Sequence, residues 1–277
     1  MRLLSFLLML INPIVMQAQL TPGAHYADVN GLHLYYEIHG QGQPLVLLHG
    51  GGSTIETTYG RVLPDLAKDF LVIAVELQAH GHTKDIDRPL SFQQDADDVA
   101  ELLRQLNVSR ADFMGFSNGG TTCLQIAIRH PKLVRKLVLM SASYKLSGHI
   151  PGFFDGFDGV TVKDLPAPLA EGFLKANPDA AGLQAMFERD VARMKAYTDI
   201  PDTDIRNITA PALVINGNQD VITIDHALEL SRTLQHGQLA ILPGVHGAYI
   251  GEICTPVPDS QLPLLSVAMV KEFLGSR

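Results

Sequence analysis

The sequence predicts an α/β fold with a mostly parallel central sheet and helices on both of its faces. Short, continuous apolar runs recur along the 277 residues, and amphipathic helical patterns separate most of them. Strands that are buried on both faces of a parallel sheet have this composition, and their alternation with helices is typical of such a sheet. A turn-rich segment near the N-terminus predicts an additional antiparallel hairpin.

The strands are predicted in order from these runs. An Asn-Gly pair at 30–31 favours a two-residue turn between the β-rich segments 26–29 and 32–38, and this gives the hairpin. The buried strands that follow are expected at residues 45–48, 70–75, 111–116, 137–140, 212–215 and 239–242.

Apolar stripes between the strands predict the helices. Asp95, Asp97 and Asp98 lie near the start of the first one, where the helix dipole favours negative charge. Asp225 is the expected N-cap of the third. The four helices are expected at residues 93–106, 118–130, 225–234 and 264–274.

Residues 144–207 interrupt the alternation of strands and helices. They contain loops rich in Gly, Pro and Phe and then a helical run at 183–197. We expect an insertion over the carboxyl edge of the sheet, the usual position of a ligand crevice in open α/β sheets. No repeat or low-complexity linker divides the chain, so residues 19–277 are predicted as one domain with a small helical cap.

The N-terminal segment has the features of a secretory signal peptide. Arg2 precedes an apolar stretch at 3–11, and Ala18 offers a small residue for cleavage. We therefore expect residues 1–18 to be removed and the protein to be periplasmic or secreted. The alternative, a membrane anchor, is disfavoured because the stretch is shorter than the ~20 residues that span a bilayer.

The remaining composition restricts the partners. A formal net charge of −8 with no Lys/Arg cluster argues against nucleic-acid binding. Cys123 and Cys254 permit one disulfide, and the alternative is a buried helix thiol and a loop thiol.

A candidate nucleophile lies at Ser117. The sequence Gly115-Phe116-Ser117-Asn118-Gly119 fits G-x-S-x-G, with an apolar strand before it and a helix after it. A nucleophile on a strained strand-to-helix turn needs this order, because small flanking residues let the backbone pass without a clash.

The base and its carboxylate are expected later in the chain. His246 follows the last predicted strand and a Pro-Gly turn, and Asp220 follows the strand at 212–215. Such a base accepts the serine proton, and a carboxylate fixes its tautomer and stabilises the imidazolium. Asp225 is the rival carboxylate, but it suits the N-cap of the next helix better.

Backbone amides near these residues can bind an oxyanion. His49-Gly50-Gly51-Gly52 follows the strand at 45–48, and bare glycine backbone can approach a substrate oxygen closely. We expect Gly51 and Asn118 to donate the two N–H groups, with Gly52 as an alternative donor that contacts the substrate. An ordinary glycine turn is the alternative interpretation of residues 49–52.

Together these motifs resemble the α/β-hydrolase superfamily, and the resemblance extends from about residue 26 to the C-terminus. It implies the order Ser117, Asp220, His246 of the catalytic triad in a serine hydrolase. Residues 76–83 also resemble a family segment that shapes the pocket floor, with Ala79 where the family usually has glycine. No role is carried over to His80 or His82, and no metal site is expected there, because further ligands are not evident.

The resemblance also ranks the activities. Ser117 excludes haloalkane dehalogenases and epoxide hydrolases, which have an aspartate at this position, and peptidase activity is disfavoured because residues 49–52 lack the following proline of proline iminopeptidases. We expect hydrolysis of carboxylic esters of small or medium acyl substrates through an acyl-enzyme, without a metal or other cofactor. A hydrolase of lactones, thioesters or carbon–carbon bonds and a non-catalytic binding protein of the same fold are the alternatives.

The cap supplies the candidate acyl-pocket residues, which are aromatic. The alternative role of these side chains is to pack the cap onto the main domain, and the two interpretations are equally supported. The candidate pocket residues are Phe153, Phe154, Phe157 and Phe187.

Overall fold

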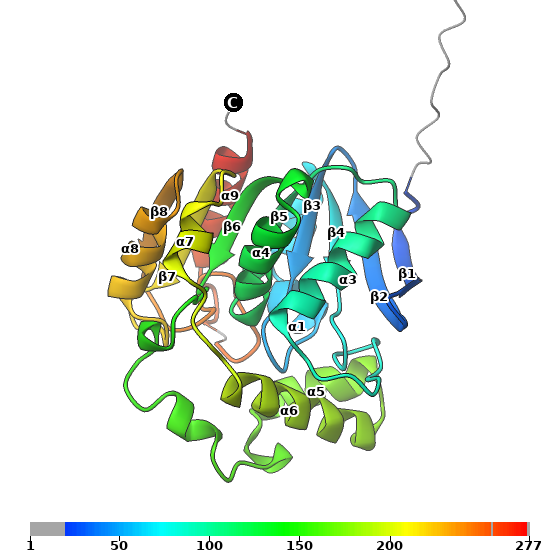
Figure 1. Ribbon diagram of the computed structural model, residues 1–277. Coiled ribbons are helices and arrows are strands. Elements are labelled where there is room, and N and C mark those ends of the chain that lie inside the picture. The colour runs from blue at the N-terminus through cyan, green and yellow to red at the C-terminus, as the bar shows by residue number, and fades with distance from the viewer. Residues whose placement is uncertain (1–19, 256, 276–277) are drawn as a thin grey trace, which may run out of the picture.

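A computed structural model describes residues 20–255 and 257–275 (Figure 1), so the predicted signal peptide lies outside the described residues. Within these ranges, eight strands form one sheet in the order β1-β2-β4-β3-β5-β6-β7-β8. β1 pairs antiparallel with β2 and β2 with β4, and all other neighbours are parallel. The strands are β1 (Gly23–Val29), β2 (Leu32–Gly40), β3 (Gln43–Leu48), β4 (Phe70–Val75), β5 (Ala111–Phe116), β6 (Val134–Met140), β7 (Ala212–Gly217) and β8 (Gly237–Leu242).

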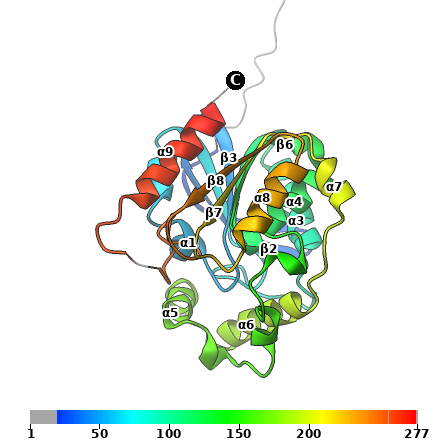
Figure 2. The same ribbon diagram turned by 90° about the vertical axis from the view of Figure 1, so that its left-hand side faces the viewer.

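Helices cover both faces of the sheet, and a separate group of helices lies beyond the carboxyl ends of the parallel strands (Figures 1 and 2). The α-helices are α1 (Ile55–Tyr59), α2 (Leu63–Leu66), α3 (Phe92–Gln105), α4 (Asn118–Arg129), α5 (Ala167–Ala176), α6 (Ala180–Lys195), α7 (Asp202–Arg206), α8 (Ile224–Thr233) and α9 (Leu262–Gly275). Short 3-10 turns are η1 (Pro131–Leu133), η2 (Leu146–Gly148), η3 (Phe154–Phe157) and η4 (Val162–Asp164). The predicted fold class is confirmed.

The sheet separates two apolar cores. Phe113 of β5 packs in the core formed with α3, α4 and α8, whereas its neighbour Met114 packs in the core formed with α1, α2 and α9. Successive side chains of a strand point to opposite faces, so continuously apolar strands supply both cores at once. This burial explains why the segments 45–48, 70–75 and 212–215 of the parallel strands are continuously apolar and do not alternate with polar residues.

The cap lies beyond the carboxyl ends of the parallel strands, below the sheet in Figure 1. It connects β6 to α7 and contains η2, η3, η4, α5 and α6. The predicted helical run at 183–197 corresponds to α6, which begins earlier because Asp179 caps it by accepting a hydrogen bond from the Ala181 amide. α5 was not predicted, because only Leu169 and Phe173 of its ten residues are buried and its apolar stripe is therefore short.

Two further expectations need correction. Thr223, not Asp225, is the N-cap of α8, and its side chain accepts from the His226 amide, so that Asp225 lies in the first turn. The helices α1, α2 and α7 were missed because each has five residues or fewer, too few to establish a helical period.

Within the described part of the chain, none of the helices is long and apolar enough to cross a bilayer. Cys123 is buried in α4 and Cys254 is exposed, and both are free thiols, so the structure contains no bridge between them.

Candidate active site

Ser117 occupies a strained turn between β5 and α4. Its φ of 53° and ψ of −120° lie in a region that L-residues seldom adopt, at a cost of about 1–3 kcal/mol. The Ser117 amide donates to Met140 O of the neighbouring strand at 2.8 Å, which holds the turn against β6. The predicted strand–turn–helix context of the serine is therefore present, and its side chain lines a cavity.

The motif glycines are required because the backbone segments around the turn nearly touch. A Cβ added at Gly115 would lie 2.2 Å from Gly119 O, and one at Gly119 would lie 2.1 Å from Leu48 O. No side chain fits at such distances, so α4 can begin this close to β3 only with glycine at both positions.

We expect Gly119→Ala to destabilise the fold by about 1–3 kcal/mol or more, because the obstructing atoms are backbone and cannot move aside. The free energy of urea unfolding measures this. Gly156→Ala is the matched control, since a Cβ there meets nothing within 4 Å, and it should change stability by less than about 0.5 kcal/mol. Equal stability of the two variants would contradict the close approach of α4 and β3.

His246 and Asp220 meet at the carboxyl edge of the sheet. His246 Nδ1 lies 2.7 Å from Asp220 Oδ1, and the His246 ring packs on Phe116, the residue before Ser117, with 4.6 Å between ring centroids. Ser117 and His246 line the same cavity. The structure therefore brings together the three residues that the sequence selected from separate loops.

Asp220 is held by more donors than the histidine alone. The Ile222 amide donates to its Oδ1 at 3.0 Å, and the Ser141 hydroxyl donates to its Oδ2 at 2.5 Å. Ser141 in turn bonds the Tyr249 hydroxyl at 2.5 Å. Burial alone would raise the pKa of Asp220, but the hydrogen bond and charge of His246 outweigh it and hold the pKa below its ordinary value. The carboxylate is therefore ionised at neutral pH.

The sequence reasoning missed Ser141 and Tyr249. The only signal was positional: Ser141 directly follows β6, the strand next to β5, and therefore lies at the same edge as Ser117.

The loop after β3, residues 49–52 and called the glycine loop below, is held in place by hydrogen bonds of His49. His49 Nδ1 donates to Gly50 O at 2.7 Å, and His49 Nε2 accepts from the Leu77 amide at 3.1 Å. Burial, with the nearby charge of His80, lowers the pKa of His49 to about 3, so its ring is neutral. The first residue of the glycine motif thus anchors the loop to the end of β4.

The Gly52 amide has different surroundings from the amides of Gly51 and Asn118, the two expected oxyanion donors. Asn118 is the first residue of α4, where a helix leaves the amide N–H without an intrahelical acceptor. Gly51 lies beside Asn118, since a Cβ on it would be 2.5 Å from Asn118 Nδ2. The Gly52 amide instead donates to Asp190 Oδ2 at 2.6 Å, so it is not free to act as the alternative donor.

A cavity of about 380 Å³ lies between these residues and the cap. Phe153, Phe157 and Phe187 line it, as does Gly52, but Phe154 does not and instead packs on Phe153, Phe157 and Tyr197. Of the four candidate aromatic residues, three can therefore touch a ligand. The other apolar residues of the wall are Leu165, Pro166, Leu169, Met186, Val191, Met194, Val221 and Ile222.

A second cavity, of about 400 Å³, adjoins the first one. Ser117 and His246 line both cavities, and Gln219, Glu252 and Thr255 make the second one more polar. An acyl compound with its carbonyl at Ser117 would therefore have room on both sides of the bond to be cleaved.

No metal centre is evident at this edge: the described residues contain no group of three or more His, Cys, Asp or Glu side chains that could hold a metal ion. The arrangement can instead polarise a serine hydroxyl, because a buried carboxylate orients the imidazole beside it and N–H groups lie at the same turn.

Comparison with known proteins agrees with this fold. Residues 43–203 match the family model described as alpha/beta hydrolase fold, and this match covers more than half of the chain. The chain therefore belongs to the α/β-hydrolase family.

The names of individual relatives refer to different kinds of hydrolase. The chain is 27% identical to the human serine hydrolase BPHL over 241 residues, covering 80% of this chain and 79% of the relative. It is 30% identical to a 2-hydroxy-6-oxo-2,4-heptadienoate hydrolase of Pseudomonas putida over 230 residues, covering 73% and 81%. The crystal structure of an enol-lactonase from Burkholderia xenovorans superposes with a TM-score of 0.71 at 22% identity, covering 91% and 100%. The family is thus one of hydrolases with diverse substrates.

Proposed function

We propose that this protein hydrolyses carboxylic esters through an acyl-enzyme on Ser117. The observation that carries the proposal is the hydrogen bond from His246 to the buried Asp220, beside a serine held at a strained turn on a cavity wall. A serine hydroxyl becomes a useful nucleophile only when a positioned base takes its proton, and this geometry supplies the base and its orienting group.

The acylation step uses the two nitrogens of His246 differently. Nδ1–H donates to Asp220, which leaves Nε2 unprotonated and able to accept the Ser117 proton while Oγ attacks the ester carbonyl. The carbonyl oxygen becomes negative and accepts hydrogen bonds from the amides of Gly51 and Asn118. When the tetrahedral intermediate collapses, the ester C–O bond breaks and His246 gives its proton to the leaving alcohol.

Deacylation repeats the sequence with water. His246 accepts a proton from water as the water oxygen attacks the acyl carbonyl, and it returns this proton to Ser117 Oγ as the carboxylic acid leaves. Asp220 stays ionised throughout and stabilises the imidazolium.

The cavity wall favours an uncharged, apolar acyl group. Among the residues that the structure describes, this wall has no Lys or Arg and one carboxylate, that of Asp190, which is neutralised by His80 and Arg193. A substrate with its own carboxylate, as the name heptadienoate implies for the relative, would find no cationic side chain on this wall. We therefore assign the acyl part of the ester to the cap-side cavity and the alcohol part to the more polar second cavity.

A substrate panel on the purified protein tests the proposal. p-Nitrophenyl esters of increasing acyl length should be hydrolysed, with a preference for small or medium chains that fit about 380 Å³. A matched panel tests the alternative bonds: lactones, thioesters and, for the carbon–carbon bond, 2-hydroxy-6-oxo-2,4-heptadienoate. Faster turnover of any of these than of the best ester would replace the ester assignment.

A fluorophosphonate probe separates catalysis from mere binding. It should label Ser117 covalently, since the probe reacts with activated serines. An unlabelled wild-type protein that still binds esters would favour the non-catalytic binding protein.

A further inference from the structure

One peptide unit of the glycine loop is held at both ends. The Gly52 N–H donates to Asp190 Oδ2 at 2.6 Å, and the Gly51 carbonyl of the same unit accepts from the Ser53 hydroxyl at 3.3 Å. A peptide unit is planar, so these two bonds fix its orientation. The N–H of Gly51 lies in the preceding peptide unit, whose carbonyl, Gly50 O, accepts from His49 Nδ1 at 2.7 Å. The two units meet at the Gly51 Cα, so the bond from Gly52 to Asp190 holds the residue on one side and the bond from His49 holds it on the other.

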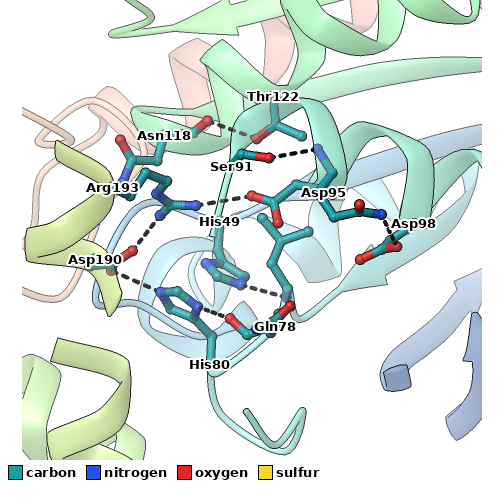
Figure 3. Close-up of polar contacts among 12 residues, drawn as sticks. His49, Gln78, His80, Ser91, Asp95, Asp98, Asn118, Thr122, Asp190 and Arg193 are labelled. Atoms are coloured by element: carbon teal, nitrogen blue, oxygen red, sulfur yellow. Dashed lines mark hydrogen bonds and ion pairs between the residues drawn. The ribbon is translucent and has the colours of Figure 1, made fainter. Parts of the chain in front are cut away.

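The residue that holds the Gly52 amide belongs to the cap. Asp190 lies on α6, and its carboxylate also accepts from His80 Nε2 at 3.0 Å and from the Arg193 guanidinium. Arg193, one turn further along α6, donates to Asp95 Oδ2 of α3 at 3.0 Å (Figure 3). A chain of charged groups thus runs from α3 through the cap helix to the glycine loop.

This chain is buried and balanced in charge. The side chains of Asp95 and Arg193 are each 2% exposed, that of His80 is 0% exposed and that of Asp190 is 13% exposed. His80 Nδ1 faces Gln78 O at 2.9 Å while Nε2 faces Asp190, so both ring nitrogens face acceptors and both carry protons. Two anions therefore oppose two cations.

The electrostatic environment agrees with these protonation states at neutral pH, since burial raises the pKa of Asp95 only to about 6. Burial would lower the pKa of His80, but the adjacent Asp190 carboxylate outweighs burial and raises it. Burial alone would raise the pKa of Asp190, but the charges of Arg193 and His80 hold it far below its ordinary value. The neutral ring of His49 packs beside His80, with 4.8 Å between centroids, and adds no competing charge.

We propose that Asp190 is a positioning residue, through which the cap helix α6 aligns the Gly51 amide for the oxyanion of the proposed ester hydrolysis. The inference rests on the proposed function, because alignment of the Gly51 amide matters only if this amide binds an oxyanion. It also gives a role to His80, whose positive charge prevents the Asp190 carboxylate from repelling the negative oxygen that develops nearby.

The variant Asp190→Asn tests the alignment. Three donors converge on the carboxylate, and an amide of the same size offers one acceptor oxygen, so its NH2 group must face at least one of them. Loss of one oxyanion donor costs about 10²–10³ in kcat, and misalignment should cost less, about 10- to 100-fold. KM should change by less than about threefold, because the oxyanion contact forms only in the transition state.

Arg189→Gln is the matched control on the same helix. Arg189 Nε lies 2.9 Å from Asp85 Oδ2 and its Nη2 donates to Ile86 O at 3.2 Å, so this variant also breaks polar contacts between the cap and the main domain, but at residues 85–86 and not at the glycine loop. Its kcat should stay within about twofold of the wild type. An equal fall of kcat in both variants would mean that general loosening of the cap is responsible, and the inference would be overturned.

A second variant covers the case in which Asp190→Asn does not fold. His80→Gln keeps a donor for Asp190 but removes the positive charge, and kcat should fall about tenfold with KM little changed. Where both variants fold, the double variant should lose less than the product of the two single losses, since both act through one group. Unchanged kcat in either folded single variant would refute the inference.

Labelling by a fluorophosphonate distinguishes failure of this inference from failure of the proposed function. The rate constant for labelling of Ser117 needs no ester substrate, and it should fall in Asp190→Asn by about the same 10- to 100-fold. A wild type that is not labelled would refute the proposed function and this inference with it. Equal labelling of wild type and Asp190→Asn would refute the inference alone.

Discussion

Ser117→Ala should abolish ester hydrolysis, with a fall in kcat on the order of 10⁶, the loss measured when a triad serine is removed elsewhere. Alanine keeps the Cβ and lacks only Oγ, so the backbone strain of the turn, at φ 53°, stays the same. The acyl-enzyme can then no longer form. Initial rates with p-nitrophenyl acetate give kcat, and mass spectrometry after a rapid quench should detect the acyl adduct on the wild type only.

Ser143→Ala is the control for this prediction. Its hydroxyl also lines the cavity, but it bonds Lys145 O at 3.0 Å and the Tyr197 hydroxyl at 3.1 Å and lies on no strand-to-helix turn. Its rate should remain within about tenfold of the wild type. If Ser117→Ala retained more than a few per cent of the wild-type rate, a nucleophile other than Ser117 would be required.

Strands and long helices could be predicted because burial dictates their composition. The segments 70–75 and 111–116 coincide with β4 and β5, which are central in the sheet and covered on both faces. β7 was predicted too short, because it continues through Asn216 and Gly217, which are polar or small but still pair with β8. Composition marks where a strand is buried, whereas hydrogen-bond pairing decides where it ends.

The position of Ser117 could be predicted because its requirements are local. Close contacts among β3, β5 and the start of α4 demand glycine at 115 and 119, and this leaves a readable motif. His246 and Asp220 could be placed only through topology: Phe116 pairs with Met140, and Met140 with Ile215, so the loops after these parallel strands share one edge.

The contact between Asp190 and His80 could not be predicted, because it joins residues 110 positions apart through the docking of the cap. A weaker signal was present. Asp190 lies four residues after Met186 and four before Met194, both buried, so it occupies the apolar stripe of α6. A charged residue in such a stripe needs a buried partner, but the sequence does not say which of the eleven histidines, or which arginine, provides it.

The second large effect is expected for Asp220→Asn, which should lower kcat/KM by about 10⁴ at neutral pH. The side chain is 0% exposed and receives His246, the Ile222 amide and the Ser141 hydroxyl. If the new NH2 group faces His246, it donates to Nδ1 and forces the proton onto Nε2, where the base function is lost. If the amide oxygen faces His246, the tautomer survives but no negative charge stabilises the imidazolium.

Asp225→Asn is the control that decides between the two carboxylates that follow β7. Asp225 lies in the first turn of α8, where its charge meets the helix dipole, a contribution of about 0.3–1 kcal/mol to stability rather than to catalysis. Its kcat/KM should therefore stay within about twofold of the wild type. Retention of more than a tenth of the activity by a folded Asp220→Asn variant would contradict the role of Asp220. The same result combined with a large loss in Asp225→Asn would transfer that role to Asp225.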